Sequence, residues 1–170
     1  MIIILNGSVG VGKTSVAWAL SGRFPTSVML DGDYIGAVHP FELASEARVA
    51  YLYETLAHLV AFHKTNGYPD FVLNYVFESP DSLAALVEKL EPLDSAIHTF
   101  WLTCTEEEQR ARILKRRTDQ WEWELKRFLE LNAIQEQASK LGFIGNHIDT
   151  TAKTAKEVAA LIWASLKPEG

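Results

Sequence analysis

Short runs of apolar residues alternate along the chain with longer stretches in which apolar residues recur every three or four positions. The runs are rich in β-branched and aromatic residues, which predicts strands over 1–6, 26–31, 70–77, 96–104 and 146–149. Helical spacing predicts helices over 13–21, about 41–66, about 80–90, about 106–116, 121–141 and after residue 154. Strands that alternate with helices predict an α/β fold with a parallel sheet covered on both faces.

Helix boundary signals support this division. Gly22 and Gly67 follow two predicted helices, and Ser79-Pro80 has the form of a capping serine with proline at the first helical position. Two capping boxes are predicted where a threonine precedes a glutamate by three residues, at Thr105/Glu108 and Thr154/Glu157. A break is expected near 117–120.

Composition narrows the class of protein. The 170 residues fit one domain, and 48% apolar with 22% charged residues is typical of a globular chain. The net charge of −6 argues against a general nucleic-acid surface. A single cysteine permits no internal disulfide, and the first apolar run is too short for a signal peptide or a membrane span. We therefore expect a cytoplasmic protein, monomer or homodimer, without nucleic-acid or membrane partners.

The glycine-rich segment after the first predicted strand has the pattern G-x-x-x-x-G-K-[ST]. Its glycines let successive backbone N–H groups point into one concavity, and the following helix adds its positive end. The lysine can reach the β- and γ-phosphates, and the threonine hydroxyl can bind Mg²⁺. The pattern predicts an ATP site formed by Gly7, Ser8, Val9, Gly10, Val11, Gly12, Lys13, Thr14 and Ser15.

Two carboxylates follow the second predicted strand, at the strand end where ligands gather in α/β sheets. Asp31 and Asp33 are two residues apart, so both side chains project to the same side of an extended chain. One can hold Mg²⁺, together with Thr14, while the other accepts a proton from a substrate hydroxyl. Either aspartate can be the base, and Asp31 is the predicted metal residue. The N-K-x-D motif of a GTP switch is absent.

The P-loop, the segment LDGDYI, an arginine-rich helix and the terminal NHIDTTAKTAKEVAALI together resemble the small P-loop kinases, which include shikimate, gluconate and adenylate kinases and chloramphenicol phosphotransferase. The resemblance implies a three-layer P-loop NTPase fold with a five-stranded parallel sheet in the order 2-3-1-4-5. It also implies a small helical lid over about 112–125 and an acceptor-binding region over about 33–66, within one kinase domain spanning residues 1–170.

The same resemblance assigns roles to residues outside the P-loop. Arg112 matches an arginine that stacks on adenine, and Thr150 begins a loop that lines the other side of the base. Arg116 and Arg117 match lid arginines that reach the transferred phosphoryl group. Guanidinium groups suit both tasks, because they stack on purines and neutralise anionic transition states. The alternative is a solvent-exposed charged helix face.

The chain departs from the kinase pattern in two places. In related proteins the third strand often ends in an aspartate near the metal, whereas this chain has Asn74 there. Asp31 is then the best partner for magnesium, and Glu78 is a weaker candidate. Between Asp33 and His63 there is one lysine or arginine, Arg48, and the chain lacks the arginines and the glycine triplet of shikimate kinase. This segment and the turn after the third strand are instead aromatic and acidic, which suits a neutral, hydroxyl-bearing and partly apolar acceptor: Tyr34, Phe41, Tyr51, Tyr53, Tyr75, Phe77 and Glu78.

These features predict a kinase that uses ATP and Mg²⁺ to phosphorylate a hydroxyl group of a small molecule. The catalytic residues expected are Lys13, Asp31, Asp33, Arg116 and Arg117. Two alternatives remain open at this point: a nucleoside or nucleotide kinase, and a nucleotide-binding regulatory protein with little turnover, which Asn74 would favour.

Overall fold

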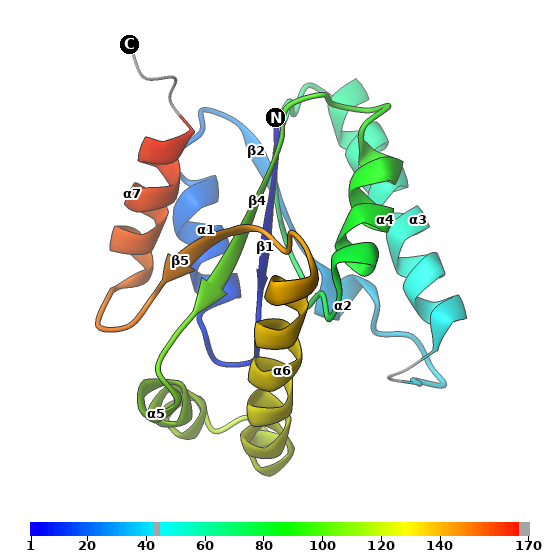
Figure 1. Ribbon diagram of the computed structural model, residues 1–170. Coiled ribbons are helices and arrows are strands. Elements are labelled where there is room, and N and C mark those ends of the chain that lie inside the picture. The colour runs from blue at the N-terminus through cyan, green and yellow to red at the C-terminus, as the bar shows by residue number, and fades with distance from the viewer. Residues whose placement is uncertain (43–44, 167–170) are drawn as a thin grey trace.

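A five-stranded parallel sheet forms the centre of the protein in the computed structural model, which describes residues 1–42 and 45–166 (Figure 1). The strands are β1 (Ile2–Gly7), β2 (Ser27–Asp31), β3 (Asp70–Asn74), β4 (Ile97–Thr103) and β5 (Asn146–Asp149). Their order is β2-β3-β1-β4-β5, and all neighbouring pairs are parallel. The α/β class and the strand order implied by the resemblance are confirmed.

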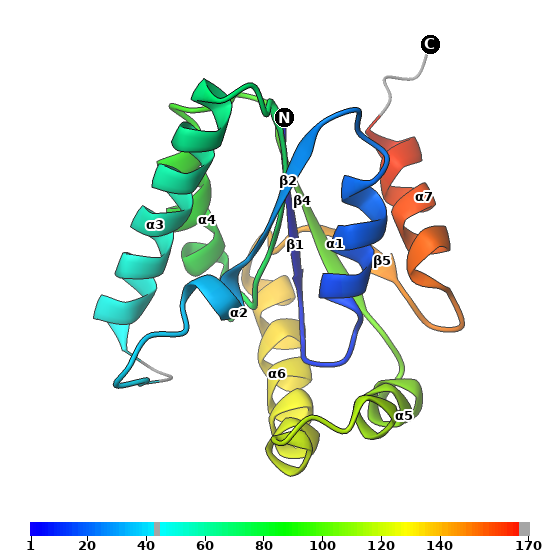
Figure 2. The same cartoon turned by 180° about the vertical axis from the view of Figure 1, so that it is seen from behind.

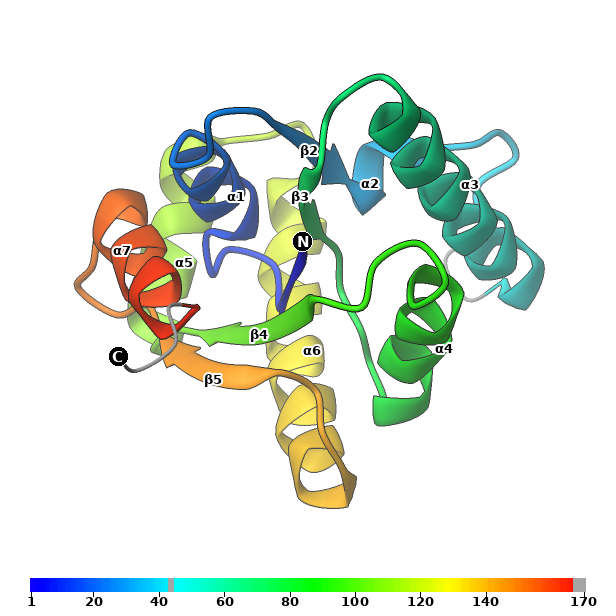
Figure 3. The same ribbon diagram turned by 90° about the horizontal axis from the view of Figure 1, so that it is seen from above.

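The described residues form seven helices, and helices pack on both faces of the sheet, which is the middle of three layers (Figure 3). Helices α1 and α7 cover one face and α3 and α4 the other, while α5 and one end of α6 lie beyond the carboxyl ends of the strands (Figure 1). The helices are α1 (Lys13–Ser21), α2 (Gly32–Ile35), α3 (Glu46–Thr65), α4 (Pro80–Leu90), α5 (Glu106–Arg116), α6 (Trp121–Leu141) and α7 (Ala155–Ser165). No described helix is both long and apolar enough to cross a membrane.

The central strand β1 divides the core into two halves. Ile2 and Ile4 face the cluster beneath α3 and α4, whereas Ile3 and Leu5 face the cluster beneath α1 and α7. All four side chains are fully buried, as the continuous apolar run of a doubly covered parallel strand requires. The two cores hold the strand ends, and therefore the loops that follow them, in fixed relative positions.

Three boundary predictions were wrong. The chain after β2 forms the short helix α2, and α3 begins only at Glu46, capped by Ser45; residues 43–44 lie outside the described residues. Strand β3 ends at Asn74, because the apolar residues that follow it enter the core without strand pairing. The predicted box at Thr105 does not form, since Glu108 accepts hydrogen bonds from Arg112 and from the Ala152 N–H instead.

The other boundary signals are confirmed. Ser79 caps α4 with Pro80 in its first turn, and the Thr154/Glu157 capping box opens α7. Viewed from behind, the loop from β1 into α1 lies at the carboxyl end of the strands, as α2 does (Figure 2). Every candidate site residue discussed below comes from this end of the sheet or from α5 and the turn after it.

Candidate active site

The P-loop joins β1 to α1, and its backbone is arranged for an anion. Gly12 is the N-cap of α1 with φ of 99°, in the left-handed region that favours glycine. No side chain caps this helix, so the first N–H groups of α1 are available to a ligand. Helix N-termini of this kind bind phosphate through free N–H donors and the helix dipole.

Lys13 lies inside this loop. Its ammonium donates to the carbonyl oxygens of Gly7 at 2.8 Å and Ser8 at 3.1 Å, and the residue is buried. Burial lowers the pKa of Lys13, an effect that the nearby Asp33 and Asp31 carboxylates partly offset. The only buried lysine in the described chain therefore lies among backbone dipoles and two carboxylates, as expected for a group that binds phosphate oxygens.

Three polar side chains meet where β2, β3 and the P-loop come together. The Thr14 hydroxyl donates to Asp31 Oδ2 at 2.9 Å, and Asn74 Nδ2 lies 3.5 Å from the same hydroxyl. Asp31 and Asn74 are also direct partners in the β2–β3 register. Strand pairing thus places Asn74 beside Asp31, and a hydrogen bond joins the two predicted metal residues, Thr14 and Asp31.

This oxygen-rich group fits magnesium. Mg²⁺ prefers hard oxygen ligands and keeps several waters, so it binds through one or two protein groups plus substrate phosphates. Within residues 1–42 and 45–166, no three His, Cys, Asp or Glu side chains cluster closely enough to hold a metal by themselves. Thr14 and Asp31 supply the hydroxyl and carboxylate that such a site needs, and the buried amide oxygen of Asn74 adds a further acceptor.

Asp33 lies in the first turn of α2, two residues after Asp31, the predicted metal residue. Its backbone N–H donates to Asp31 Oδ1 at 3.0 Å, which holds the Asp31 carboxylate against the start of α2. Desolvation raises the pKa of Asp33 even though part of its side chain is exposed; Lys13, Arg48 and Arg116 oppose the increase, and Asp31 adds to it. A carboxylate whose pKa lies above the usual range is better suited to accept a proton.

The predicted acceptor region separates into core and surface residues. Tyr53 and Phe77 are buried in the core, so their aromatic character reflects packing. Arg48 is buried beside the site: it donates to the Tyr75 hydroxyl at 3.3 Å and stacks over the Phe41 ring at 4.8 Å. Tyr34 is 80% exposed. Arg48 and Tyr75 are thus the polar groups held firmly on the side of Asp33.

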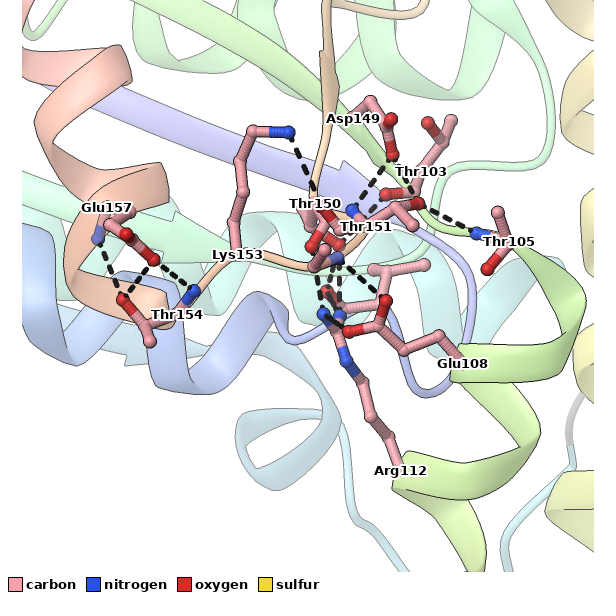
Figure 4. Close-up of polar contacts among 12 residues, drawn as sticks. Thr103, Thr105, Glu108, Arg112, Asp149, Thr150, Thr151, Lys153, Thr154 and Glu157 are labelled. Carbon is pink, nitrogen blue, oxygen red and sulfur yellow. Dashed lines mark hydrogen bonds and ion pairs between the residues drawn. The ribbon is translucent and has the colours of Figure 1, made fainter.

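Arg112 and Thr150, both predicted to contact the base, are in direct contact (Figure 4). The Arg112 guanidinium donates to Thr150 Oγ1 at 3.0 Å, to the Thr150 carbonyl oxygen at 2.9 Å and to the Val11 carbonyl oxygen at 3.0 Å. Glu108 pairs with the same guanidinium. These hydrogen bonds are made by N–H groups at the edge of the planar guanidinium, so its faces remain available to stack on a base. Thr150 itself is only 1% exposed, which favours a positioning role.

The two predicted lid arginines differ in their surroundings. Arg116, at the end of α5, pairs with Glu124 of α6 at 3.0 Å across the intervening turn. Its charge acts on both Lys13 and Asp33, since it lowers the pKa of each. Arg117 caps α5 in a left-handed conformation with φ of 42°. Of the two predicted lid arginines, Arg116 is therefore the one whose charge acts on the candidate catalytic residues.

Several side-chain contacts in and near the P-loop were not predicted from the sequence. The Gln109 side chain donates to the Val9 carbonyl oxygen, and the Ser8 hydroxyl donates to the Phe128 carbonyl oxygen at 3.1 Å. Arg127 pairs with Glu78, which the sequence had offered as a weaker metal candidate. Each of these contacts joins segments far apart in the sequence, so no local spacing could signal it.

A family model described as AAA domain matches residues 2–141. The chain belongs to the AAA domain family. No curated protein matches this AAA domain protein, but many solved structures share its fold.

Three of those structures cover nearly the whole AAA domain chain. The tunicamycin resistance protein of Deinococcus radiodurans is 20% identical with a TM-score of 0.67, over 97% of this chain and 94% of its own. A sugar kinase from Janibacter sp. HTCC2649 is 14% identical with a TM-score of 0.67, over 98% and 95%. Shikimate kinase from Acinetobacter baumannii is 20% identical with a TM-score of 0.60, over 97% and 92%. At these identities the likeness establishes the fold that small P-loop kinases share.

Proposed function

We propose that this protein transfers the γ-phosphoryl group of ATP to a hydroxyl group of a small molecule. The observation that carries the proposal is the position of Asp33, whose backbone is hydrogen-bonded to Asp31 and whose carboxylate lies within electrostatic reach of the P-loop lysine, Lys13. A phosphate-binding loop alone would fit any nucleotide-binding protein. A carboxylate with a raised pKa beside that loop fits a reaction in which a hydroxyl group loses a proton.

The residues of the P-loop bind and orient the triphosphate. The N–H groups at the start of α1 and the Lys13 ammonium neutralise the charge on the β- and γ-phosphates. Thr14 and Asp31 would hold the magnesium ion, which supplies further neutralisation of phosphate charge when bound. Both Asp31 oxygens already accept hydrogen bonds, from the Thr14 hydroxyl and from the Asp33 N–H, so we assign Asp31 to the metal and Asp33 to the base.

The proposed transfer is a direct displacement. The acceptor oxygen forms a bond to the γ-phosphorus while the bond from that phosphorus to the β–γ bridging oxygen breaks, and ADP leaves. Asp33 takes the hydroxyl proton. Arg116 approaches the transferred group from the lid and stabilises its negative charge, and Arg112 holds the adenine by stacking.

The acceptor is proposed to be a neutral hydroxylated molecule with an apolar part. A groove of about 520 Å³ beside Thr14 and Asp31 is otherwise lined by Trp18, Met29, Leu30, Tyr34, Ile35 and Leu59. Ligand sites of this kind combine apolar walls with a few polar groups that orient the substrate. The names of structurally similar proteins, a sugar kinase and a shikimate kinase, also support a small hydroxylated acceptor.

The test is an ADP-release assay with ATP, Mg²⁺ and panels of sugars, nucleosides, nucleoside monophosphates and hydroxylated antibiotics. We expect transfer to one class of neutral alcohol, and a Lys13→Met variant should lose it while remaining folded. Preference for nucleosides or nucleoside monophosphates would support the nucleoside or nucleotide kinase alternative. Tight ATP binding without transfer to any acceptor would contradict the proposal and support a regulatory nucleotide-binding protein.

A further inference from the structure

The Asn74 side chain carries a buried oxygen whose hydrogen-bonding capacity is unused. Asn74 is 1% exposed, and its Oδ1 is one of two buried side-chain atoms without a partner among the described residues. Buried amide oxygens are nearly always hydrogen-bonded, because leaving one unpaired costs about 1–3 kcal/mol. An orphan of this kind points to a ligand or a water.

The orientation of the amide follows from its neighbours. The Thr14 hydroxyl donates its proton to Asp31, so its oxygen can only accept from Asn74. Nδ2, which lies 3.5 Å from that oxygen, is the atom that can donate, and this turns Oδ1 away from Thr14. Exchanging the two amide atoms would set two acceptors against each other and leave an N–H group orphaned.

The orphan oxygen belongs to the same small group as the candidate metal residues. Asn74 ends β3 in register with Asp31 at the end of β2, and its amide contacts the Thr14 hydroxyl. We propose that Asn74 Oδ1 accepts a hydrogen bond from a water on the magnesium ion, so that a neutral amide and only one carboxylate surround the metal. The inference rests on the proposed function, because it assumes the metal-dependent nucleotide site.

This arrangement has a consequence for metal affinity. A second carboxylate at position 74 would attract the dication strongly, whereas the amide contributes a dipole and a hydrogen bond. The chain thus holds the metal more weakly than a two-carboxylate site would. Residue 74 should therefore control metal affinity without changing how the protein binds a metal-free nucleotide.

The test measures Mn²⁺ binding to the full chain with saturating ADP, by the electron paramagnetic resonance signal of free Mn²⁺. Asn74→Leu should weaken Mn²⁺ binding about tenfold, the usual effect of losing an outer-shell partner, while the Kd for metal-free ADP stays within twofold. Asn74→Asp has the same size and should bind Mn²⁺ about tenfold more tightly. It also keeps the test valid if the leucine variant does not fold.

An exchange of the two side chains gives the sharpest comparison. Asp31→Asn alone should weaken Mn²⁺ binding, and adding Asn74→Asp restores one carboxylate on the opposite strand. If both positions face the same ion, the double variant recovers at least about tenfold of the lost affinity. Recovery supports the inference, and a double variant no better than Asp31→Asn overturns it.

The outcomes separate this inference from the proposed function. If the wild-type protein binds ADP and Mn²⁺ but Asn74→Asp binds Mn²⁺ within twofold of wild type, only the role of Asn74 is overturned. If the wild-type protein binds neither ATP nor ADP, the proposed function itself is overturned, and the inference with it.

Discussion

The Arg112 guanidinium donates to the Val11 carbonyl oxygen at 3.0 Å, which ties α5 directly to the P-loop. Thr150 joins the same two groups, since its hydroxyl lies 3.0 Å from each of them. Helix α5 and the loop after β5 therefore share a contact with the P-loop. We therefore expect a change in this contact to weaken nucleotide binding more than it lowers the stability of the fold.

Replacing Arg112 by lysine should weaken ATP binding about tenfold. Lysine keeps the charge but loses the planar fork that reaches Val11 and Thr150 together, and it cannot stack on a base in the same way. Isothermal titration calorimetry with Mg·ATP measures the change. Arg110→Lys on the exposed side of the same helix is the matched control and should bind ATP like wild type; equal affinities for both variants would contradict the role of Arg112.

Replacing Asp33 by asparagine should lower the transfer rate about a thousandfold and leave ATP affinity unchanged. It should also stabilise the protein slightly at neutral pH. Because the pKa of Asp33 is raised on folding, its charged form destabilises the folded state as pH rises through that pKa.

The Asp33→Asn variant has no charged carboxylate at this position and so avoids its cost. Its melting temperature at pH 8 should be about 1–3 °C above that of wild type, a small effect because part of the Asp33 side chain is exposed. The difference should vanish near pH 3, where both states of the aspartate are protonated. Differential scanning fluorimetry at the two pH values measures it. A transfer rate equal to wild type would show that another group is the base.

The pH dependence of phosphoryl transfer should reflect the ionisation of the Asp33 carboxylate. Since the pKa of Asp33 lies above its usual range, kcat/KM should fall on acidification at a higher pH than an ordinary aspartate gives. The Arg116 charge lowers this pKa, so Arg116→Gln should move the acidic limb to higher pH as well as lowering kcat. Arg117→Gln is the control, because Arg117 is not among the charges of the described residues that shift the pKa of Asp33.

The sequence predicted the strands well because burial on both faces leaves a strong local signal. It missed α2, since four residues are too few for a helical period, and it extended β3 through Phe77, whose burial does not depend on strand pairing. The P-loop and the DGD segment are contiguous motifs, which is why their residues could be named in advance.

The contacts that connect those motifs could not be named. Glu108 fits a capping box by spacing, yet the Ala152 N–H and Arg112 are its partners in the fold. The Asp31–Asn74 pairing depends on the register of two strands separated by about forty residues of chain, including all of α3. Sequence patterns describe local preference, and these partners are chosen by tertiary structure.

Replacing Thr150 by valine should destabilise the protein by about 1–3 kcal/mol. The shape is conserved, but the buried hydroxyl lies 3.0 Å from the Val11 carbonyl oxygen and 2.9 Å from that of Thr103, and it accepts a hydrogen bond from Arg112. The methyl group of valine would remove the charge-assisted hydrogen bond from Arg112 and the bonds of the hydroxyl to the two carbonyl oxygens. The Val11 and Thr103 carbonyl oxygens would keep only their bonds from Arg112 and from the Thr150 N–H.

Urea unfolding measures the free energy directly, and the same variant should bind ATP more weakly because Arg112 loses one of its anchors. Thr151→Val is the matched control in the same loop. Its hydroxyl donates to the exposed Asp149 and accepts from the N–H of the exposed Thr105, so its removal should cost less than about 1 kcal/mol. Unfolding free energies that are equal for the two variants would mean that the buried hydroxyl does not hold this loop to the P-loop.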